Sequence, residues 1–571
     1  MISDTTPLTS LSGRLERIYG KERAPGIRCA IEELLERHAG AIAPRARGWS
    51  EADALLITYA DSITGPEAPL RTLHRFLREQ MGGLLSFVHL LPFYPFTSDD
   101  GFSVTNFRAV RGELGGWEDV EAMAADYRLV FDGVINHASA SGVYMKGYCS
   151  GDSRYRDFFL ALDPSTDTSS VLRTRNLPLL HDYATSEGVK WLWTTFSRDQ
   201  VDLNYANPRV LIEMLDVLLF YARRGATMIR LDAIPYLWKE QGTSCAHLPQ
   251  THELIRLMRD VLTEAAPHLL LLTETNVPHR ENISYFGDRG DEAQMIYNFS
   301  LPPLIVWSLL KGDARVLSRW AAGLELVGEN ATYLNITATH DGIGMRPTEG
   351  LLSEPERAEL VRLARERGGD VTGKRNADGS ISPYELNLSY FDAINDPRAN
   401  PGVETELARY LLSQAIPMAL IGMPGVYIHS LLGSRNDLEG VRRTGRARSI
   451  NRAQLDLETL CAELADPGSL RARVLSGYRH LLRTRAGESA FHPGAAQEVP
   501  DFGSAVFAVL RTNRETGRRV LALHNVSGEN VNVTLPWAGT DRLDGARCPA
   551  GSLRLAPYQV RWIAAGVSGG R

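Results

Sequence analysis

The segment VLIEMLDVLLFYARRGATMIRLDAI, residues 210–234, joins a long apolar run to a shorter one through a glycine. The first part has the length of a buried helix, and the second is rich in strand-forming residues. Arg230 and Asp232 lie two positions apart in the second part, so on a strand both side chains point to the same face. Burying two opposite charges rarely gains stability over apolar residues. The pair is either a structural ion pair or part of a functional site, and this segment alone does not decide.

Seven further runs along the chain resemble the strand that carries Arg230 and Asp232. Helical patterns lie between several of them, for example in residues 69–83 after the first run. A strand followed by a helix, repeated eight times, predicts an α/β fold with a closed parallel (β/α)8 barrel, the TIM barrel. The eight runs are ALLITYADSI (54–63), LLSFVHLLPFYP (84–95), RLVFDGVINH (128–137), ATMIRLDAI (226–234), HLLLLTETN (268–276), AQMIYNF (293–299), ATYLNITATHD (331–341) and PMALIGMPGVYI (417–428).

Three regions are expected along the chain. Residues 1–50 read as a helical N-terminal extension, and residues 51–490 as the catalytic barrel. Two stretches of the barrel, about 139–207 and 346–401, are too long for ordinary loops, so we expect these insertions to shape a pocket. Residues 491–571 contain short alternating strands with turn residues between them, which predicts a small antiparallel β domain.

Composition narrows the class of protein. The 571 residues are 44% hydrophobic and 23% charged, as in globular proteins, and the formal net charge is -6. With no long basic run, nucleic acids and anionic membranes are not expected partners. Because the N-terminal sequence lacks a signal-peptide pattern and no window approaches ~18 apolar residues, a cytoplasmic location is expected. We expect small-molecule substrates, while a homodimer stays open because the sequence does not fix the oligomeric state.

Metal and redox sites are not indicated. The five cysteines are widely scattered without CxxC spacing, which argues against zinc sites, redox pairs and a disulfide framework. The chain also lacks the GxGxxG motif of dinucleotide-binding folds. We therefore expect an enzyme that needs no cofactor and no metal.

Ionisable residues occur at the ends of four predicted strands. They are Asp132 with Asn136 and His137, Arg230 with Asp232, Glu274, and His340 with Asp341. In a barrel of this kind the carboxyl ends of the strands meet at one rim, where the chemistry is carried out. A single such residue would more often be a satisfied polar group of the core, but four strand ends together predict a site.

The expected chemistry is that of carboxylates. Three acids, Asp232, Glu274 and Asp341, suit the protonation of a leaving oxygen and the stabilisation of a cationic carbon, as glycoside cleavage requires. Arg230 should favour the ionised form of Asp232, as a nucleophile requires, while apolar surroundings and other acids should keep Glu274 protonated. The sequence therefore predicts a charged and a neutral carboxyl acting on one anomeric carbon.

The ordered motifs DGVINH, RLDAI, LLTETN and ATHDG resemble the four motif regions of the α-amylase clan of retaining α-glycosidases. The resemblance implies that Asp232 is the nucleophile, Glu274 the acid/base and Asp341 the stabiliser of the transition state. It also implies that Arg230, His137 and His340 orient the nucleophile and the glucose. Asn136 matches a position that binds calcium in some amylases, but no further ligands are evident and no metal is predicted.

Residues 54 to about 460 are similar to the sucrose phosphorylase group within that clan. The similarity is carried by LPFYPFTSDDGFSVTNF, KWLWTTFSRDQVDLNY, KEQGTSCAHLPQTHELI and GRARSINR. It implies that Asp99 and Arg448 bind glucose hydroxyls and that Phe102 is an aromatic platform, although a core aromatic is equally compatible with Phe102. Such an enzyme transfers glucose in two displacements and gives α-glucose 1-phosphate with retained configuration.

Phosphate is already ionised at pH 7, so it needs cations rather than a general base. Arg175 resembles a phosphate-side arginine of the group, and Arg346 is a further candidate, although either could be a solvated loop charge. Tyr236 and Asn276 complete the candidate residues for the acceptor and phosphate. In sucrose phosphorylases the position of Asn276 usually holds a histidine that contacts fructose.

The segments TETNVPH and HDGIGMRPTEG, with the N-terminal extension, look closer to the branch that acts on 2-O-α-glucosylglycerate. The function predicted from this resemblance is phosphorolysis of that glucoside. Phosphorylases of sucrose, sucrose 6-phosphate or glucosylglycerol remain alternatives, as does a plain α-glucosidase. A non-catalytic partner of a transporter is disfavoured because all three acids are present.

Overall fold

The computed structural model describes residues 7–376, 378–399 and 401–566. At its centre eight parallel strands close into a barrel in the order β1-β17-β13-β12-β11-β10-β4-β3. Each of the eight predicted runs supplies one strand, so the predicted (β/α)8 barrel is confirmed. The barrel strands are β1 (Leu55–Thr58), β3 (Phe87–Leu90), β4 (Arg128–Gly133), β10 (Ala226–Leu231), β11 (Leu270–Thr273), β12 (Met295–Tyr297), β13 (Thr332–Ile336) and β17 (Met423–Tyr427).

The helix α6 (Pro208–Arg223) leads into the strand that carries Arg230. It begins at Asn207, whose side chain accepts a hydrogen bond from the backbone N–H of Arg209, and Pro208 follows at the first helical position. Gly225, with a φ of 101°, lets the chain turn back into β10. All six residues of β10 are buried between β4 and β11. The backbone of Arg230 is therefore fixed in a buried barrel strand rather than in a loop.

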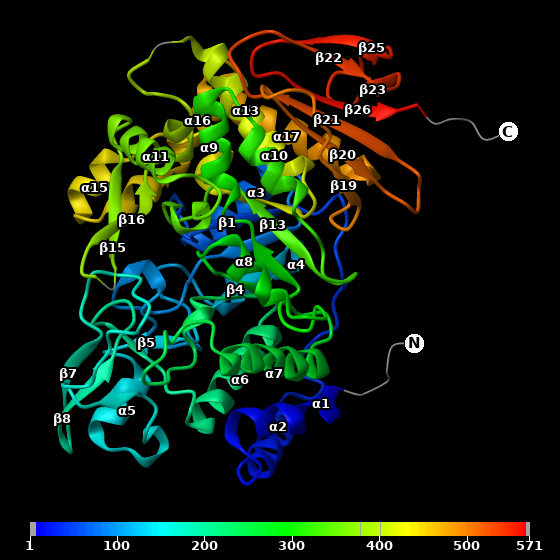
Figure 1. Ribbon diagram of the computed structural model, residues 1–571. Helices are drawn as coiled ribbons and strands as arrows, with labels where there is room; N and C mark the ends of the chain where they lie inside the picture. The colour runs from blue at the N-terminus through cyan, green and yellow to red at the C-terminus, as the bar shows by residue number, and fades with distance from the viewer. Residues whose placement is uncertain (1–6, 377, 400, 567–571) are drawn as a thin grey trace.

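Helices between and after the strands pack around the barrel (Figure 1). The longer ones are α3 (Pro69–Met81), α4 (Trp117–Asp126), α7 (Pro249–Ala265), α9 (Leu301–Lys311), α10 (Arg315–Ala322), α13 (Val403–Ala419), α16 (Leu457–Ala465) and α17 (Leu470–Ala486). Shorter elements are β2 (Ile63–Thr64), α8 (His279–Ile283), α14 (Ile428–Leu431), α15 (Leu438–Thr444) and β18 (Leu455–Asp456).

Two insertions follow the carboxyl ends of barrel strands. The first lies between β4 and α6 and contains β5 (His137–Ser139), α5 (Val143–Ser150), β6 (Ala161–Leu162), β7 (Leu180–Thr185), β8 (Gly188–Trp193) and β9 (Gln200–Asp202). The second lies between β13 and α13 and contains β14 (Ile343–Gly344), α11 (Glu354–Glu366), β15 (Asp370–Arg375), β16 (Ile381–Asn387) and α12 (Tyr390–Ile394). Since both leave the same rim of the barrel, they supply walls for a pocket there.

The N-terminal helices α1 (Pro7–Tyr19) and α2 (Ala24–His38) pack against the barrel helices α6 and α7 (Figure 1). Arg14 donates to Asp260 at 2.7 Å, and the hydroxyl of Tyr19 donates to the backbone oxygen of Tyr205 at 2.9 Å. These contacts fasten the extension to the outside of the barrel.

The C-terminal region is an antiparallel β structure, as predicted. Its main sheet has the strand order β19-β20-β21-β26-β23-β24, and β22 pairs with β25 beside it. The strands are β19 (Ala496–Glu498), β20 (Val506–Thr512), β21 (Arg519–Asn525), β22 (Val531–Leu535), β23 (Gly539–Asp541), β24 (Arg547–Cys548), β25 (Gly551–Leu555) and β26 (Val560–Ala565).

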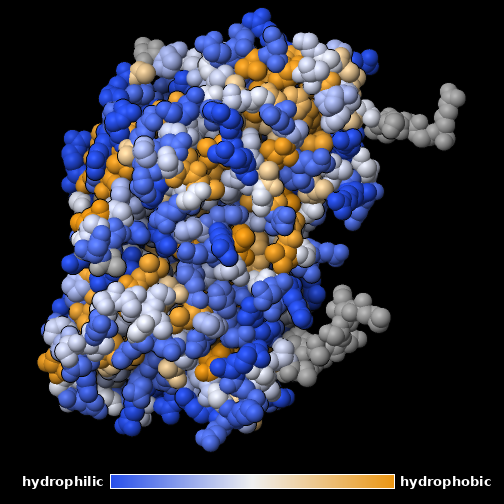
Figure 2. Space-filling model, viewed as in Figure 1, coloured by the Kyte–Doolittle hydropathy of each residue, from blue (hydrophilic) through white to orange (hydrophobic). Residues whose placement is uncertain are grey.

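The surface carries no large apolar band on the face shown in Figure 2, where apolar patches alternate with hydrophilic side chains. The exposed large hydrophobic residues of the described chain are scattered: Val143, Leu177, Val189, Ile381, Val403 and Leu438. Among the described helices, none is long and apolar enough to cross a membrane.

Candidate active site

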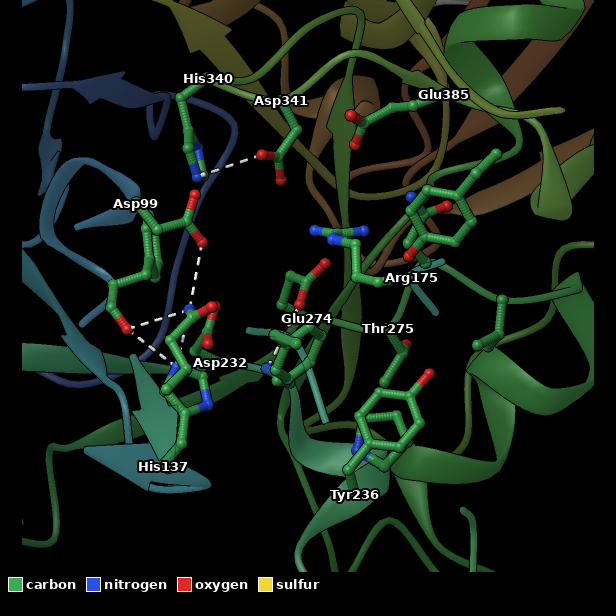
Figure 3. Close-up of a pocket in the computed structure, with 18 of the residues that line it drawn as sticks. Asp99, His137, Arg175, Asp232, Tyr236, Glu274, Thr275, His340, Asp341 and Glu385 are labelled. Atoms are coloured by element: carbon green, nitrogen blue, oxygen red, sulfur yellow. Dashed lines mark hydrogen bonds and ion pairs between the residues drawn. The ribbon is translucent and has the colours of Figure 1, made fainter. Parts of the chain in front are cut away.

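A pocket opens at the carboxyl rim of the barrel. It gathers side chains from barrel strand ends and from both insertions (Figure 3). The barrel and the two insertions therefore each supply part of the pocket wall. The lining residues are Asp99, Phe102, His137, Arg175, Phe196, Gln200, Arg230, Asp232, Ala233, Pro235, Tyr236, Glu274, Thr275, Asn276, Val277, His340, Asp341, Tyr384, Glu385 and Arg448.

Arg230 is the cation around which the acids of the pocket are arranged. Its guanidinium forms an ion pair with Asp132, lies 3.1 Å from Asp232 and lies 3.9 Å from Glu274. Arg230 is 2% exposed, and Asp132 is fully buried. Arg230 therefore has a structural and a functional role. It forms an ion pair with Asp132 inside the barrel, and it orients the two pocket acids Asp232 and Glu274.

The two predicted catalytic acids share one electrostatic environment. Burial raises the pKa of Asp232 to about 7, although Arg230 opposes the rise. Burial also raises the pKa of Glu274 to about 7, against Arg230 and with help from Asp232. We expected a charged Asp232 beside a neutral Glu274, but without ligand the environments do not separate the two. Arg230 is already engaged by Asp132, so burial outweighs its charge at both carboxyls, and each holds its proton more tightly than an exposed acid does.

Asp341 has a different environment on the opposite side of the pocket. Burial would raise its pKa, but Arg448 above all, with Arg452 and Arg230, lowers it below its ordinary value. The guanidinium of Arg448 lies 2.7 Å from Asp341, and that of Arg452 lies 3.5 Å from it. Burial lowers the pKa of His340 to about 3, so this imidazole is neutral at pH 7. Asp341 is therefore a permanent carboxylate.

The segment 99–101 brings Asp99 into the pocket. Asp99, Asp100 and Gly101 all have positive φ, at 52°, 49° and 112°, which is unusual for three consecutive residues. Gln200 donates to the carboxylate of Asp99 at 3.1 Å. Arg452 and Arg446 form ion pairs with Asp100 at 2.5 and 2.7 Å, and these pairs hold the loop in its strained conformation.

Phe102 and the histidines form the floor of this half of the pocket. The ring of Phe102 is stacked on that of His340, with the ring centroids 5.0 Å apart. The guanidinium carbon of Arg230 also lies over the Phe102 ring, 5.4 Å from its centroid. The Nε2 atom of His137 lies 2.8 Å from the backbone oxygen of Phe102. Phe102 is thus a wall of the pocket and also a packing partner of two other site residues.

The four candidate acceptor residues do not all reach the pocket. Arg175, Tyr236 and Asn276 line it, and the side-chain oxygen of Asn276 is buried without a hydrogen-bond partner among the described residues. Arg346 is 6% exposed, lies 3.5 Å from Glu281 and does not line the pocket. Arg346 is therefore a buried arginine outside the pocket lining.

Asn136, at the position that resembles a calcium ligand, accepts a hydrogen bond from an ammonium group. Lys239 lies 3.0 Å from the side-chain oxygen of Asn136 and 2.7 Å from Asp202. Asp202 is fully buried and also accepts hydrogen bonds from Thr195. In the described part of the chain no cluster of His, Cys, Asp or Glu could hold a metal ion.

Several lining residues were not predicted from the sequence. Glu385, Tyr384 and Phe196 come from the two insertions, and Gln200 comes from β9. The hydrophobic pattern of an insertion does not predict which of its residues fold back over the barrel. The one usable signal is the acid Glu385 in the strand-like run ISPYELN.

Comparison with known proteins agrees with this geometry. The profile of the α-amylase catalytic domain matches residues 83–333, and that of the D-apionate lactonase C-terminal immunoglobulin-like domain matches residues 505–563. Glucosylglycerate phosphorylase of Allomeiothermus silvanus is 47% identical over 97% of this chain and 98% of its own length. Glucosylglycerate phosphorylase of Escherichia coli is 42% identical over 91% of this chain and 93% of its own length.

More distant similarity extends to other phosphorylases. Sucrose phosphorylase of Agrobacterium vitis is 29% identical over 79% of this chain and 91% of its own length. The crystal structure of sucrose 6F-phosphate phosphorylase from Thermoanaerobacter thermosaccharolyticum superposes with a TM-score of 0.73 at 22% identity, covering 90% of this chain and 99% of that one. This last similarity concerns the fold.

Proposed function

Because this chain belongs to the family of glucosylglycerate phosphorylases, we propose that its pocket transfers glucose between 2-O-α-glucosylglycerate and inorganic phosphate. The products are α-glucose 1-phosphate and glycerate. The observation that carries the proposal is the convergence of two carboxyls, those of Asp232 and Glu274, on one arginine in one pocket. That arrangement is what a retaining glycosyl transfer needs.

The reaction has two displacements. Asp232 attacks the anomeric carbon, while Glu274 gives its proton to the departing glycerate oxygen. The resulting glucosyl ester is then attacked by a phosphate oxygen, which restores the original anomeric configuration. The first step needs one carboxylate and one carboxylic acid, and a pKa raised toward neutrality suits Glu274 to the role of the acid.

The glucose would be held by the half of the pocket opposite Arg175. Asp341 and Asp99 offer carboxylates to sugar hydroxyls, Arg448 and the neutral imidazole of His340 offer donors, and His137 completes this side. A permanent negative charge on Asp341 also favours the positive charge that develops on the sugar ring in the transition state.

Arg175 is our candidate for the residue that binds the anionic group of phosphate or glycerate. Its guanidinium carbon lies 5.3 Å from the ring of Tyr384 and 5.7 Å from that of Phe196. Among the described acidic side chains none forms an ion pair with Arg175, so its charge is available to phosphate or glycerate. Tyr236 and the unpartnered oxygen of Asn276 would lie on the same side of the pocket as Arg175. Arg346 would influence this side through its charge and not by direct contact.

An acceptor panel tests the proposed function. The enzyme is incubated with α-glucose 1-phosphate and D-glycerate, fructose, fructose 6-phosphate or glycerol, and released phosphate is measured. D-Glycerate should accelerate release far more than the other three. If glycerate gives no acceleration over water, the proposed substrate is wrong.

Location and domain limits complete the proposal. A cytoplasmic location is supported by the five cysteines, all of them described and none in a disulfide. We place the domain limits near residues 50 and 490, as expected from the sequence. The barrel with its two insertions would carry the chemistry, and the C-terminal sheet would cover its helices.

A further inference from the structure

An acid outside the pocket holds the loop of residues 97–103, here called the sugar loop. Asp199 lies in the first insertion, directly before β9, and is not among the residues that line the pocket. Its carboxylate accepts hydrogen bonds from the hydroxyl groups of Thr97 and Ser98, both at 2.5 Å. Because a hydrogen bond to a charged acceptor is about twice as strong as one between neutral groups, these contacts fix the beginning of the sugar loop.

The backbone of Asp199 holds the other end of the sugar loop. Its carbonyl oxygen accepts a hydrogen bond from the hydroxyl group of Ser103 at 2.9 Å. The two ends also bind each other, since the backbone N–H of Thr97 donates to the carbonyl oxygen of Ser103 at 3.1 Å. One residue therefore contacts both ends of a loop from which Asp99 and Phe102 line the pocket.

Asp199 is itself anchored to β5, the strand that follows barrel strand β4. The backbone N–H of Ala140 donates to the carbonyl oxygen of Asp199 at 2.9 Å, and the hydroxyl group of Ser139 lies 3.3 Å from its carboxylate. The next residue, Gln200, pairs with Ser139 between β9 and β5 and donates to the carboxylate of Asp99 at 3.1 Å. Two consecutive residues thus hold the sugar loop, one at its ends and one at its pocket-facing acid.

The sugar loop needs this support because its middle is strained. Asp99 and Asp100 both have positive φ although both carry a Cβ. The ion pairs of Asp100 with Arg446 and Arg452 hold the middle of the loop. These ion pairs do not involve residues 97, 98 or 103, whose hydroxyl groups bind Asp199. Without Asp199, the ends of the loop are free to move and the strain can relax.

We propose that Asp199 is a positioning residue of glucosyl transfer, which fixes the ends of the sugar loop and thereby the places of Asp99 and Phe102. This inference rests on the proposed function and extends it. Asp199 does not touch the sugar. It determines where the carboxylate of Asp99 meets a sugar hydroxyl group, so its loss weakens the recognition of that hydroxyl group in particular.

The first test compares sugars that differ by one hydroxyl group. Fluoride release is measured from α-glucosyl fluoride and from its 4-deoxy and 6-deoxy analogues. In wild-type enzyme, loss of the hydroxyl group that Asp99 binds should lower kcat/KM by about 10- to 100-fold, as for a hydrogen bond to a charged group. Asp199→Ala should lower kcat/KM for α-glucosyl fluoride by about 10- to 100-fold, as for a small displacement of a substrate-binding group. It should also lower at least one of the two ratios of glucosyl to deoxyglucosyl fluoride by about fivefold or more.

The ratios separate positioning from damage to the fold. A smaller fraction of folded enzyme lowers kcat/KM for all three fluorides equally and leaves both ratios unchanged. Asp163→Ala is the matched control, because Asp163 is an exposed acid of the same insertion that accepts the backbone N–H of Ser165 at 2.8 Å, outside the pocket. It should change neither kcat/KM nor the ratios.

The second test asks whether Asp199 acts through the hydroxyl groups of the sugar loop. Ser98→Ala removes one of the two donors to the carboxylate and should lower the same ratio, though less than Asp199→Ala does. The double variant should be no worse than Asp199→Ala alone, because the two residues share one interaction. Asp199→Asn keeps an acceptor oxygen and should retain more of the ratio than Asp199→Ala. Losses that multiply in the double variant would overturn the inference.

The outcomes keep the two proposals apart, because kcat/KM for fluoride release reports the steps up to the glucosyl-enzyme and does not depend on the acceptor. If wild-type enzyme does not use glycerate in the acceptor panel, the proposed function fails. If it uses glycerate but Asp199→Ala keeps both wild-type ratios, the role of Asp199 is wrong and the function stands. If Asp199→Ala does not fold, Ser98→Ala carries the test, and unchanged ratios in that variant overturn the inference.

Discussion

At Glu274 the enzyme keeps a carboxyl where burial disfavours its charge. Its pKa is raised from an ordinary value near 4.5 to about 7. A raised pKa in the folded state means that the native protein binds the proton more tightly than the unfolded chain. The stabilising protonated form is therefore present at low pH and lost as the pH rises from about 4.5 through 7.

Replacing this acid should stabilise the protein where the acid is charged. Glu274→Gln is expected to raise the free energy of unfolding at pH 8 by about 1–3 kcal/mol, while activity is lost. At pH 5 the difference from wild type should nearly vanish, because Glu274 is then already neutral. Denaturant unfolding at both pH values measures this. An equal difference at pH 5 and pH 8 would contradict the assignment.

Lys239 is a buried cation that pairs with Asp202. Lys239→Met should destabilise the fold by about 3 kcal/mol, because it leaves the buried carboxylate of Asp202 without its cation. Lys311→Met is the matched control, since Lys311 is 40% exposed and pairs with Glu359 at 3.0 Å. Its cost should stay below about 1 kcal/mol. Thermal unfolding compares the two, and equal costs would show that the ammonium of Lys239 is not needed.

At the scale of the element, the short turn η1 (Asp99–Gly101) holds a strained conformation that positions Asp99. A Cβ at Gly101 would lie 2.6 Å from the backbone oxygen of Pro92, and its φ is 112°. Gly101→Ala therefore requires the turn to move, and Asp99 moves with it. Strain in this turn is compensated by the ion pairs of Asp100.

The expected effect of Gly101→Ala is a fall of about 10- to 100-fold in kcat/KM for α-glucose 1-phosphate, as for a small displacement of a substrate-binding group. Gly40→Ala is the control, because Gly40 also has a positive φ, 70°, but has open space around it. It should cost some stability and leave kinetics unchanged. Steady-state kinetics at pH 7 decide; wild-type kinetics for Gly101→Ala would show that the turn does not set the position of Asp99.

At the scale of the whole molecule, the sequence predicts what periodicity and strand ends determine. Eight apolar runs give the eight barrel strands, and acids at their ends give Asp232, Glu274 and Asp341 in one pocket. Arg448 and Asp99 are placed there by resemblance. These parts are predictable because a closed parallel barrel brings the carboxyl ends of its strands to one rim.

The rest depends on how insertions fold over that rim. Glu385 and Phe196 reach the pocket from the two insertions, whose direction is set by tertiary packing, so no local pattern identifies them. Arg346 shows the converse, because its position in the chain suits a ligand-binding arginine but it is not among the residues that line the pocket. Sequence reasoning also missed Lys239, whose role depends on a partner in β9.

The closure of the barrel has a consequence for biosynthesis. The first strand, β1, has β17 as one of its two neighbours, and residues 423–427 emerge from the ribosome long after residues 55–58. Arg448 follows later still. A nascent chain that lacks residues 423–427 has an open sheet, and one that lacks Arg448 has an incomplete sugar site. Glucosyl transfer can therefore begin only when most of the polypeptide has been made.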